Sequence, residues 1–153
     1  PIYVQSNKAG KVVAPFACIH SVDSLHLAQT LNRHAEEQGK QLAILLQVNV
    51  ANEASKEGMS LAETPELARQ IACLPALRIE GLMTIAPLVS DPQEIRPVFR
   101  ELRLLRERLR EEVSNGNWAQ LSMGMTDDYH VAIEEGATIV RVGRAIFGQR
   151  PAH

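Results

Sequence analysis

A chain of 153 residues, 45% of them hydrophobic, is long enough to bury one core, and we expect residues 1–153 to form a single domain. The net charge of −2 lacks the basic surplus typical of proteins that bind nucleic acid. We expect neither a signal peptide nor a membrane span, because no apolar run is long enough to cross a bilayer. Two cysteines cannot form a disulfide framework, so we expect a reducing, cytoplasmic compartment.

The first half of the chain alternates helix and strand signals. Asp23 is a candidate N-cap for a helix with apolar residues at helical spacing, which ends at Gly39. Residues 42–50 form an apolar run without alternation, which is typical of a parallel strand covered on both faces. Thr64 and Pro65 then predict the N-cap and first position of the next helix.

The second half continues the pattern. Asp91 opens a segment with capping-box chemistry, and a long amphipathic helix follows it. The expected elements are strands at residues 77–85, 119–122 and 138–142, helices at residues 95–113 and 126–136, and a short helix after Gly143.

The resulting order, β-α-β-α-β-α-β-α, predicts an α/β fold with a parallel sheet and right-handed crossovers. Four strands are counted in this way, with part of a further strand at residues 2–4. A complete eight-stranded barrel needs about 200 residues or more. The chain is therefore too short to form a whole barrel.

Two strand-to-helix turns late in the chain are candidates for a phosphate site. Ser122, Met123 and Gly124 end one strand, and Gly143 and Arg144 follow the next. In a barrel, neighbouring turns of this kind hold phosphate groups. The alternatives stay open: Thr126 to Asp128 cap an ordinary helix, Gly143 makes an ordinary tight turn, and Arg144 is a solvated cation.

Three further side chains lie on the predicted strand ends. Arg141 interrupts the apolar run of residues 139–142, where it either contacts a ligand or forms a structural ion pair. Asn49 offers an amide for hydrogen bonding, and Met83 either packs against a flat ring or fills the core. His20 has either a role at this rim or a packed, structural one.

Other titratable residues point to structure rather than chemistry. The histidines and cysteines show no metal-ligand spacing, so we expect no metal. The arginines of residues 95–113 alternate with glutamates, which predicts a solvated helix face with ion pairs at helical spacing.

Several segments occur together in an order that is specific, although each is weak alone. They are Gln5-Ser-Asn-Lys8, His20-Ser-Val-Asp23, Leu46-Gln-Val-Asn-Val50 with Asn52-Glu53 and Ser55-Lys-Glu-Gly58, Gly81-Leu-Met-Thr84, Leu121-Ser-Met-Gly-Met125 with Asp127-Asp128, and Val140-Arg-Val-Gly143 with Ala145-Ile-Phe-Gly148. With these segments the chain resembles the pyridoxal phosphate homeostasis protein family, whose fold is the TIM (β/α)₈ barrel of alanine racemase.

The resemblance implies a pyridoxal 5′-phosphate site at the strand carboxyl ends. It puts Ser122, Gly124, Gly143 and Arg144 around the phosphate and Arg141 against the pyridine nitrogen. The implied function is non-catalytic cofactor binding in intracellular vitamin B6 and amino-acid homeostasis. The partner is then a small molecule, without nucleic acid or membrane.

Two departures from the family matter. The Schiff-base lysine of the first strand has no counterpart here, and Arg144 stands where the family more often has Thr or Ser. By the match, the chain covers about five C-terminal βα units of the barrel and lacks the N-terminal strands. We therefore expect the missing strands elsewhere: in further residues, in a partner chain, or by self-association.

Two other functions remain open. A fold-type III enzyme, such as an amino-acid racemase or decarboxylase, would need a catalytic lysine and an acid–base partner, and Ile85 stands where racemases place His. A structural barrel fragment without ligand is the other alternative.

Overall fold

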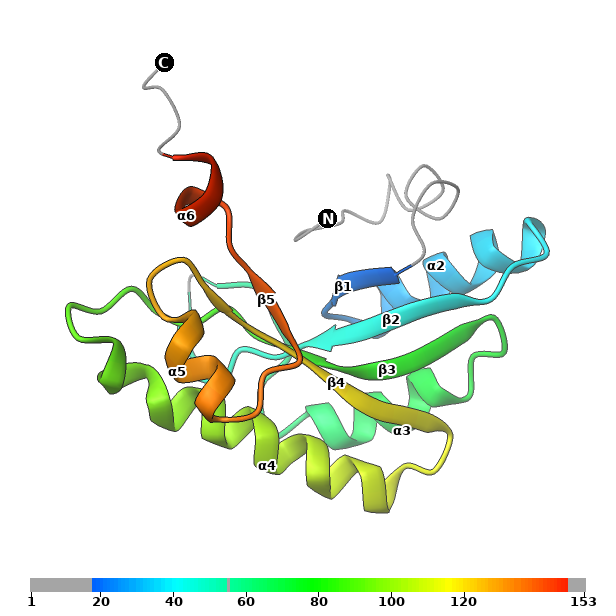
Figure 1. Cartoon of the computed structure of the whole chain (residues 1–153). Coiled ribbons are helices and arrows are strands. Elements are labelled where there is room, and N and C mark those ends of the chain that lie inside the picture. Colours follow the sequence, from blue (N-terminus) through cyan, green and yellow to red (C-terminus); the bar gives the residue numbers. More distant parts are fainter. Residues whose placement is uncertain (1–17, 55, 149–153) are drawn as a thin grey trace.

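A computed structural model of the protein describes residues 18–54 and 56–148 (Figure 1). Within these residues, parallel strands form one sheet in the order β1-β2-β3-β4-β5. The strands are β1 (Cys18–Val22), β2 (Leu42–Gln47), β3 (Leu77–Met83), β4 (Gly116–Met125) and β5 (Ile139–Arg141). The helices are α2 (Leu25–Glu37), α3 (Thr64–Ala72), α4 (Arg96–Glu112), α5 (Tyr129–Glu134) and α6 (Arg144–Phe147), with a 3₁₀ turn, η2 (Pro92–Ile95).

The predicted alternation of strands and helices is confirmed, with one strand more than the four that were counted. The missed strand is β1, a short segment whose polar residues His20 and Ser21 hide its strand character. The expected strand at residues 2–4 lies outside the described residues. Within those residues, β1 and β5 each pair with one strand, so the sheet has two open edges and is an incomplete barrel.

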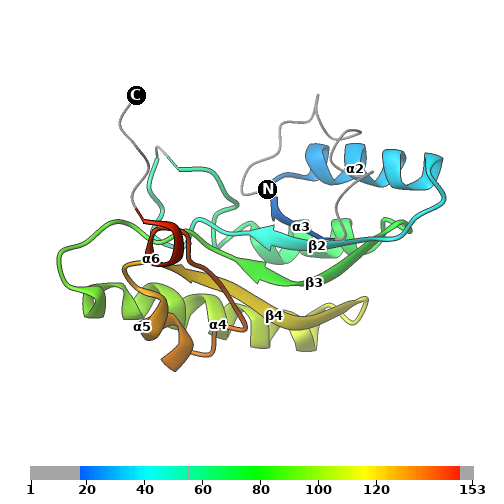
Figure 2. The same ribbon diagram turned by 45° about the horizontal axis from the view of Figure 1, so that its top comes forward.

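Helices pack on one face of the sheet. In Figure 1, α3, α4 and α5 run along its lower side and α2 lies behind β1 and β2, while Figure 2 shows α4 and α5 beneath the sheet. The core between these layers includes Leu46 of β2, Leu82 of β3 and Leu121 of β4. Because successive strand residues point to opposite faces, the neighbouring Gln47, Met83 and Ser122 lie on the other, concave face.

Burial agrees with the sequence pattern. Every residue of β2 is buried, as predicted for a parallel strand covered on both faces. The apolar stripe of the long helix is buried as well, at Ile95, Phe99, Leu102, Leu105, Leu109 and Val113.

Two predicted helix caps are wrong by one residue or more. Ser24, not Asp23, caps α2: its backbone is extended and its hydroxyl accepts a hydrogen bond from the Leu27 amide at 3.1 Å. Thr64 lies inside α3, because the Ser60 hydroxyl already accepts the Glu63 amide one turn earlier, at 3.2 Å.

Strand boundaries also differ from those predicted. The strand expected at residues 119–122 runs from Gly116 to Met125, because Gly116, which looks like a turn residue, pairs with Ile79 of β3. The other strands are shorter than predicted, and Val48 makes only an isolated bridge to Met59. The helix expected from residue 126 begins at Tyr129.

Gly81 allows β3 and β4 to approach closely. A Cβ at this position would overlap the carbonyl oxygen of Gln120 in the neighbouring strand. The strand register also shifts between Ile79 and Gly81, which is the mark of a bulge. Glycine is therefore required here by the backbone of β4 rather than by a turn.

The basic face of α4 is tied to α5. The Glu135 carboxylate, 6% exposed, accepts hydrogen bonds from Arg96 at 3.1 Å, Arg100 at 3.2 Å and Arg103 at 3.4 Å. Ion pairs at helical spacing were predicted and occur, for example between Arg108 and Glu112. The main ion pairs, however, join two helices, which the pattern of a single helix cannot show.

We predict that Glu135→Gln lowers the free energy of unfolding at pH 7 by about 1–3 kcal/mol, because three guanidinium groups lose a shared negative charge and one of its two acceptor oxygens. Burial alone would raise the pKa of Glu135, but hydrogen bonds from Arg100 and Arg96 outweigh burial and hold it below the ordinary glutamate value. The contribution of Glu135 to stability is thus fully present above the ordinary glutamate pKa, and it is lost as pH falls through the lowered pKa of Glu135 in the folded protein.

Urea unfolding of the unaltered protein and of Glu135→Gln, from pH 7 downward, measures the difference in their free energies of unfolding. The control is Glu134→Gln, whose carboxylate is 58% exposed and should change stability by less than about 1 kcal/mol. Equal losses in the two variants at pH 7 would contradict the assignment.

Candidate functional site

The carboxyl ends of the strands meet at one edge of the sheet, where the loops after β4 and β5 lie together. The Ala145 amide donates to the Thr126 hydroxyl at 3.4 Å, and the Arg144 guanidinium pairs with the Asp127 carboxylate. These two contacts hold the loops side by side, as the sequence predicted for two neighbouring βα turns.

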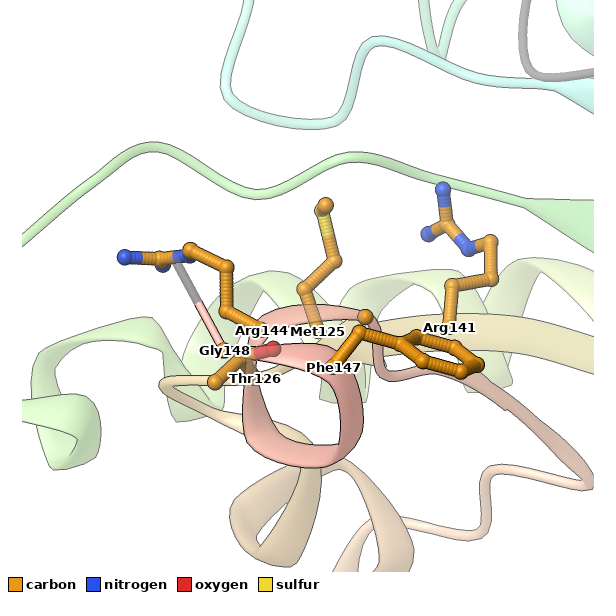
Figure 3. A pocket seen from close by; sticks show the side chains of 7 residues that line it. Met125, Thr126, Arg141, Arg144, Phe147 and Gly148 are labelled. Atoms are coloured by element: carbon orange, nitrogen blue, oxygen red, sulfur yellow. The ribbon is translucent and has the colours of Figure 1, made fainter. Parts of the chain in front are cut away.

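A cavity of about 470 Å³ lies against these loops. Its lining residues are Met125, Thr126, Arg141, Gly143, Arg144, Phe147 and Gly148 (Figure 3). In this view, Met125 stands between the side chains of Arg141 and Arg144, and Phe147 lies in front. Of the predicted site residues, the structure brings Arg141, Gly143 and Arg144 together at this cavity.

Arg141 has covered nitrogen atoms without partners. Its Nη2 donates to the carbonyl oxygen of Thr84 at 2.6 Å, whereas Nε and Nη1 are buried and make no hydrogen bond with residues 18–54 or 56–148. Burial lowers the pKa of the guanidinium, and the more distant Asp128 carboxylate opposes this shift. In the described part of the chain no carboxylate pairs with Arg141, so the structural ion pair considered from the sequence is not formed.

Thr84 connects the strand ends. Its hydroxyl donates to the Val48 carbonyl at 2.7 Å, its amide donates to the Ser122 carbonyl at 3.1 Å, and its own carbonyl accepts from Arg141. One fully buried residue therefore links the ends of β2, β3, β4 and β5. Thr84 closes the Gly81-Leu-Met-Thr84 segment, but its role depends on tertiary contacts that the sequence does not show.

The glycines of the two loops differ in their surroundings. Gly124 has φ +98°, and a Cβ there would lie 2.7 Å from the Cβ of Ala132, so glycine lets this loop pack on α5. A Cβ on Gly143 would meet nothing within 4 Å. Gly143 therefore leaves the cavity open, while the packing of the protein alone explains Gly124.

The capping alternative for the first loop is only partly correct. Thr126 does not cap α5, because its hydroxyl accepts the Ala145 amide instead. Asp128 does bind the turn, since its carboxylate accepts the Met125 amide at 2.6 Å.

Ser122 and Met123 point to opposite faces of β4. Met123 belongs to the core beneath the helices, so a contact with a ligand would have to use its backbone. Ser122 is fully buried on the concave face, where its hydroxyl lies 3.2 Å from Nδ1 of His20. The sequence left the role of His20 open, and the structure brings it to the predicted site.

Asn49 and Met83 are more remote from the cavity. The Asn49 amide binds its own loop: Nδ2 donates to the Glu53 carbonyl at 2.8 Å, and Oδ1 accepts the Glu53 amide at 3.2 Å. Met83 is fully buried and lies in register between Gln47 and Ser122. Ligand contacts of Asn49 and Met83 stay predictions.

Gln47 is a polar residue of this face that sequence reasoning did not single out. It is 3% exposed, and its Oε1 has no hydrogen-bond partner. A buried amide oxygen without a partner is costly, as are the free nitrogens of Arg141. The signal available in the sequence was an amide directly after the five apolar residues 42–46.

The described residues form neither a metal-binding cluster nor a membrane-spanning helix. No three His, Cys, Asp or Glu side chains of residues 18–54 and 56–148 gather closely enough to hold a metal ion. The helices in these ranges are too short or too polar to span a bilayer.

Comparisons with known proteins agree on one family. The sequence model of the alanine racemase N-terminal domain matches residues 2–151. A relative from Aquifex aeolicus named pyridoxal phosphate homeostasis protein is 41% identical over 147 residues, which are 96% of this chain and 64% of that protein. The chain thus spans less than two thirds of the length of this relative.

Solved structures give the same result. PipY of Synechococcus elongatus, solved with PLP bound, has 39% identity and a TM-score of 0.89, over 95% of this chain and 68% of PipY. Alanine racemase of Clostridium difficile in complex with cycloserine is only 16% identical, with a TM-score of 0.77 over 98% of this chain and 41% of the racemase, and shows the fold alone. The chain therefore belongs to the alanine racemase N-terminal domain family, among the proteins named pyridoxal phosphate homeostasis protein, and its sheet is an incomplete barrel of that fold.

Proposed function

We propose that this protein binds pyridoxal 5′-phosphate (PLP) without catalysing a reaction and serves vitamin B6 and amino-acid homeostasis in the cytoplasm. The observation that carries the proposal is Arg141, whose two unpaired, covered nitrogens lie beside an open cavity at the strand carboxyl ends. Relatives of this chain carry the name pyridoxal phosphate homeostasis protein, and PipY was solved with PLP bound. The free Cys18 and Cys73 suit a reducing compartment.

The residues at this edge suit the two ends of the cofactor. Around the phosphate we place Ser122, the backbone of Met123 and Gly124, Gly143 and Arg144. Arg144 supplies a cation, and Gly143 leaves room for close approach of a ligand. On the concave face, Met83 would pack on the ring side, and Asn49 would hold the adjacent loop in place.

Arg141 is assigned to the pyridine nitrogen. When bound, PLP supplies an aldehyde and an electron-withdrawing ring. A guanidinium donates hydrogen bonds but cannot accept one from a protonated ring N–H, so Arg141 would keep the ring nitrogen unprotonated. An unprotonated ring is a weaker electron sink, which suits a protein that holds the cofactor more than one that drives carbanion chemistry.

The proposal of a non-enzymatic role also has support in what the chain presents. Ile85 occupies the place where racemases have His, and the side chain of an isoleucine cannot transfer a proton. A racemase or decarboxylase activity finds no supporting arrangement in the described residues.

We expect PLP to bind saturably to the chain, and Arg141→Met to weaken binding at least about tenfold, because a charge-assisted donor is lost. Isothermal titration calorimetry measures both affinities. The control is Arg108→Met on α4, whose side chain is 58% exposed and distant from the strand ends, and which should bind as the unaltered protein does. Equal affinity of the Arg141 variant and the control would contradict the assigned site.

The same variant should gain stability without ligand. The stability gained by removing a covered charge with two unpaired nitrogens exceeds the stability lost with the one hydrogen bond that Arg141 donates to Thr84. We therefore expect Arg141→Met to raise the free energy of unfolding by about 1 kcal/mol in urea without PLP. A loss of stability would show that the arginine serves the fold rather than a ligand.

We further propose that additional strands complete the barrel in the working protein. The open edges of β1 and β5 support this, since unpaired strand edges favour association. If this chain is studied alone, native mass spectrometry should find dimers or larger assemblies. A stable monomer of 16.9 kDa that stays soluble at high concentration would contradict self-association.

A further inference from the structure

A polar cluster crosses the concave face of the sheet. His20 comes from β1, Ser122 from β4 and Arg141 from β5, and they lie far apart in the sequence. His20 Nδ1 and Ser122 Oγ are 3.2 Å apart, although β2 and β3 separate their strands. The contact is possible only because the sheet curves.

The hydroxyl of Ser122 has a restricted environment. Ser122 is fully buried, and His20 is the side chain that reaches its hydroxyl within the described residues. The hydroxyl can therefore donate its single proton either to the imidazole or to a ligand, but not to both. The direction of the hydrogen bond between His20 and Ser122 therefore determines whether the hydroxyl proton is available to a ligand.

The imidazole of His20 is held neutral at this position. Burial lowers the pKa of His20, and the positive charge of Arg141 lowers it further. A neutral imidazole carries one ring proton. With the proton on Nδ1, His20 donates to Ser122 and leaves the hydroxyl proton for a ligand; with the proton on Nε2, the hydroxyl donates to His20.

From this geometry we propose that His20 is a positioning residue for the phosphate of the ligand, acting through Ser122. A phosphate oxygen beside Ser122 is an acceptor, so it selects the arrangement in which His20 donates to Ser122 and Ser122 donates to the phosphate. The inference rests on the proposed function, because it places the phosphate beside Ser122. His20 has no direct contact with the ligand in this arrangement.

The test compares two ligands that lack an aldehyde, 4′-deoxypyridoxine 5′-phosphate and 4′-deoxypyridoxine, so that reactions with lysine do not contribute. His20→Leu should weaken binding of the phosphorylated ligand about tenfold and leave the other within about twofold, because only the phosphate depends on Ser122. His20→Asn should restore most of the affinity, because its amide places a donor close to the position of Nδ1.

A double variant separates positioning from a structural role. In a Ser122→Ala background, His20→Leu should cost less than about twofold, since the hydroxyl through which it acts is gone. Circular dichroism and urea unfolding establish that each variant is folded.

The outcomes distinguish the two proposals. If the unaltered chain binds neither ligand, the proposed function and this inference both fail. If it binds the phosphorylated ligand and His20→Leu binds equally well, only this inference fails. Equal weakening for both ligands, or an undiminished effect in the Ser122→Ala background, would also overturn it.

Discussion

The hydrogen bonds of Thr84 hold the carboxyl edge of the sheet together. The hydroxyl of this buried residue donates to Val48 after β2, and its amide donates to Ser122 of β4. Its carbonyl accepts from Arg141 of β5, so the ends of four strands are linked through it. Because all five strands are parallel, the loops that follow them meet at this edge. The positions of Ser122 and of Arg141, which lines the cavity, depend on this link.

The same edge carries polar groups that the protein does not satisfy. Arg141 and Gln47 have buried atoms without partners in the described residues, whereas the buried hydroxyls of Ser122 and Thr84 are hydrogen-bonded. A fold selected for stability alone would replace such groups by apolar ones. The unpaired nitrogens of Arg141 beside an open cavity are the expected sign of a ligand site, where stability is given up for binding.

Local signals in the sequence predicted most of the fold. Unbroken apolar runs identified the parallel strands, and the stripe of α4 was predicted almost residue by residue. What failed depends on contacts between distant residues: β1 carries polar residues that hide its strand character, β4 includes residues that look like a turn, and Glu135 binds arginines from another helix. For the site, Arg141, Gly143 and Arg144 were predicted beside one another from neighbouring turns. Thr84 meets Arg141 through its carbonyl, and His20 meets Ser122 across the curved sheet, and the sequence shows neither contact.

The most direct test of the account is NMR of the arginine side chains in ¹⁵N-labelled protein during titration with PLP. The Nε–H signal of Arg141, identified by its absence in Arg141→Met, should shift and saturate at one equivalent, because this covered group gains an acceptor. The signal of Arg108 should stay in place. If PLP binds and the Arg141 signal does not move, the cofactor lies elsewhere, and the unpaired guanidinium does not mark its site.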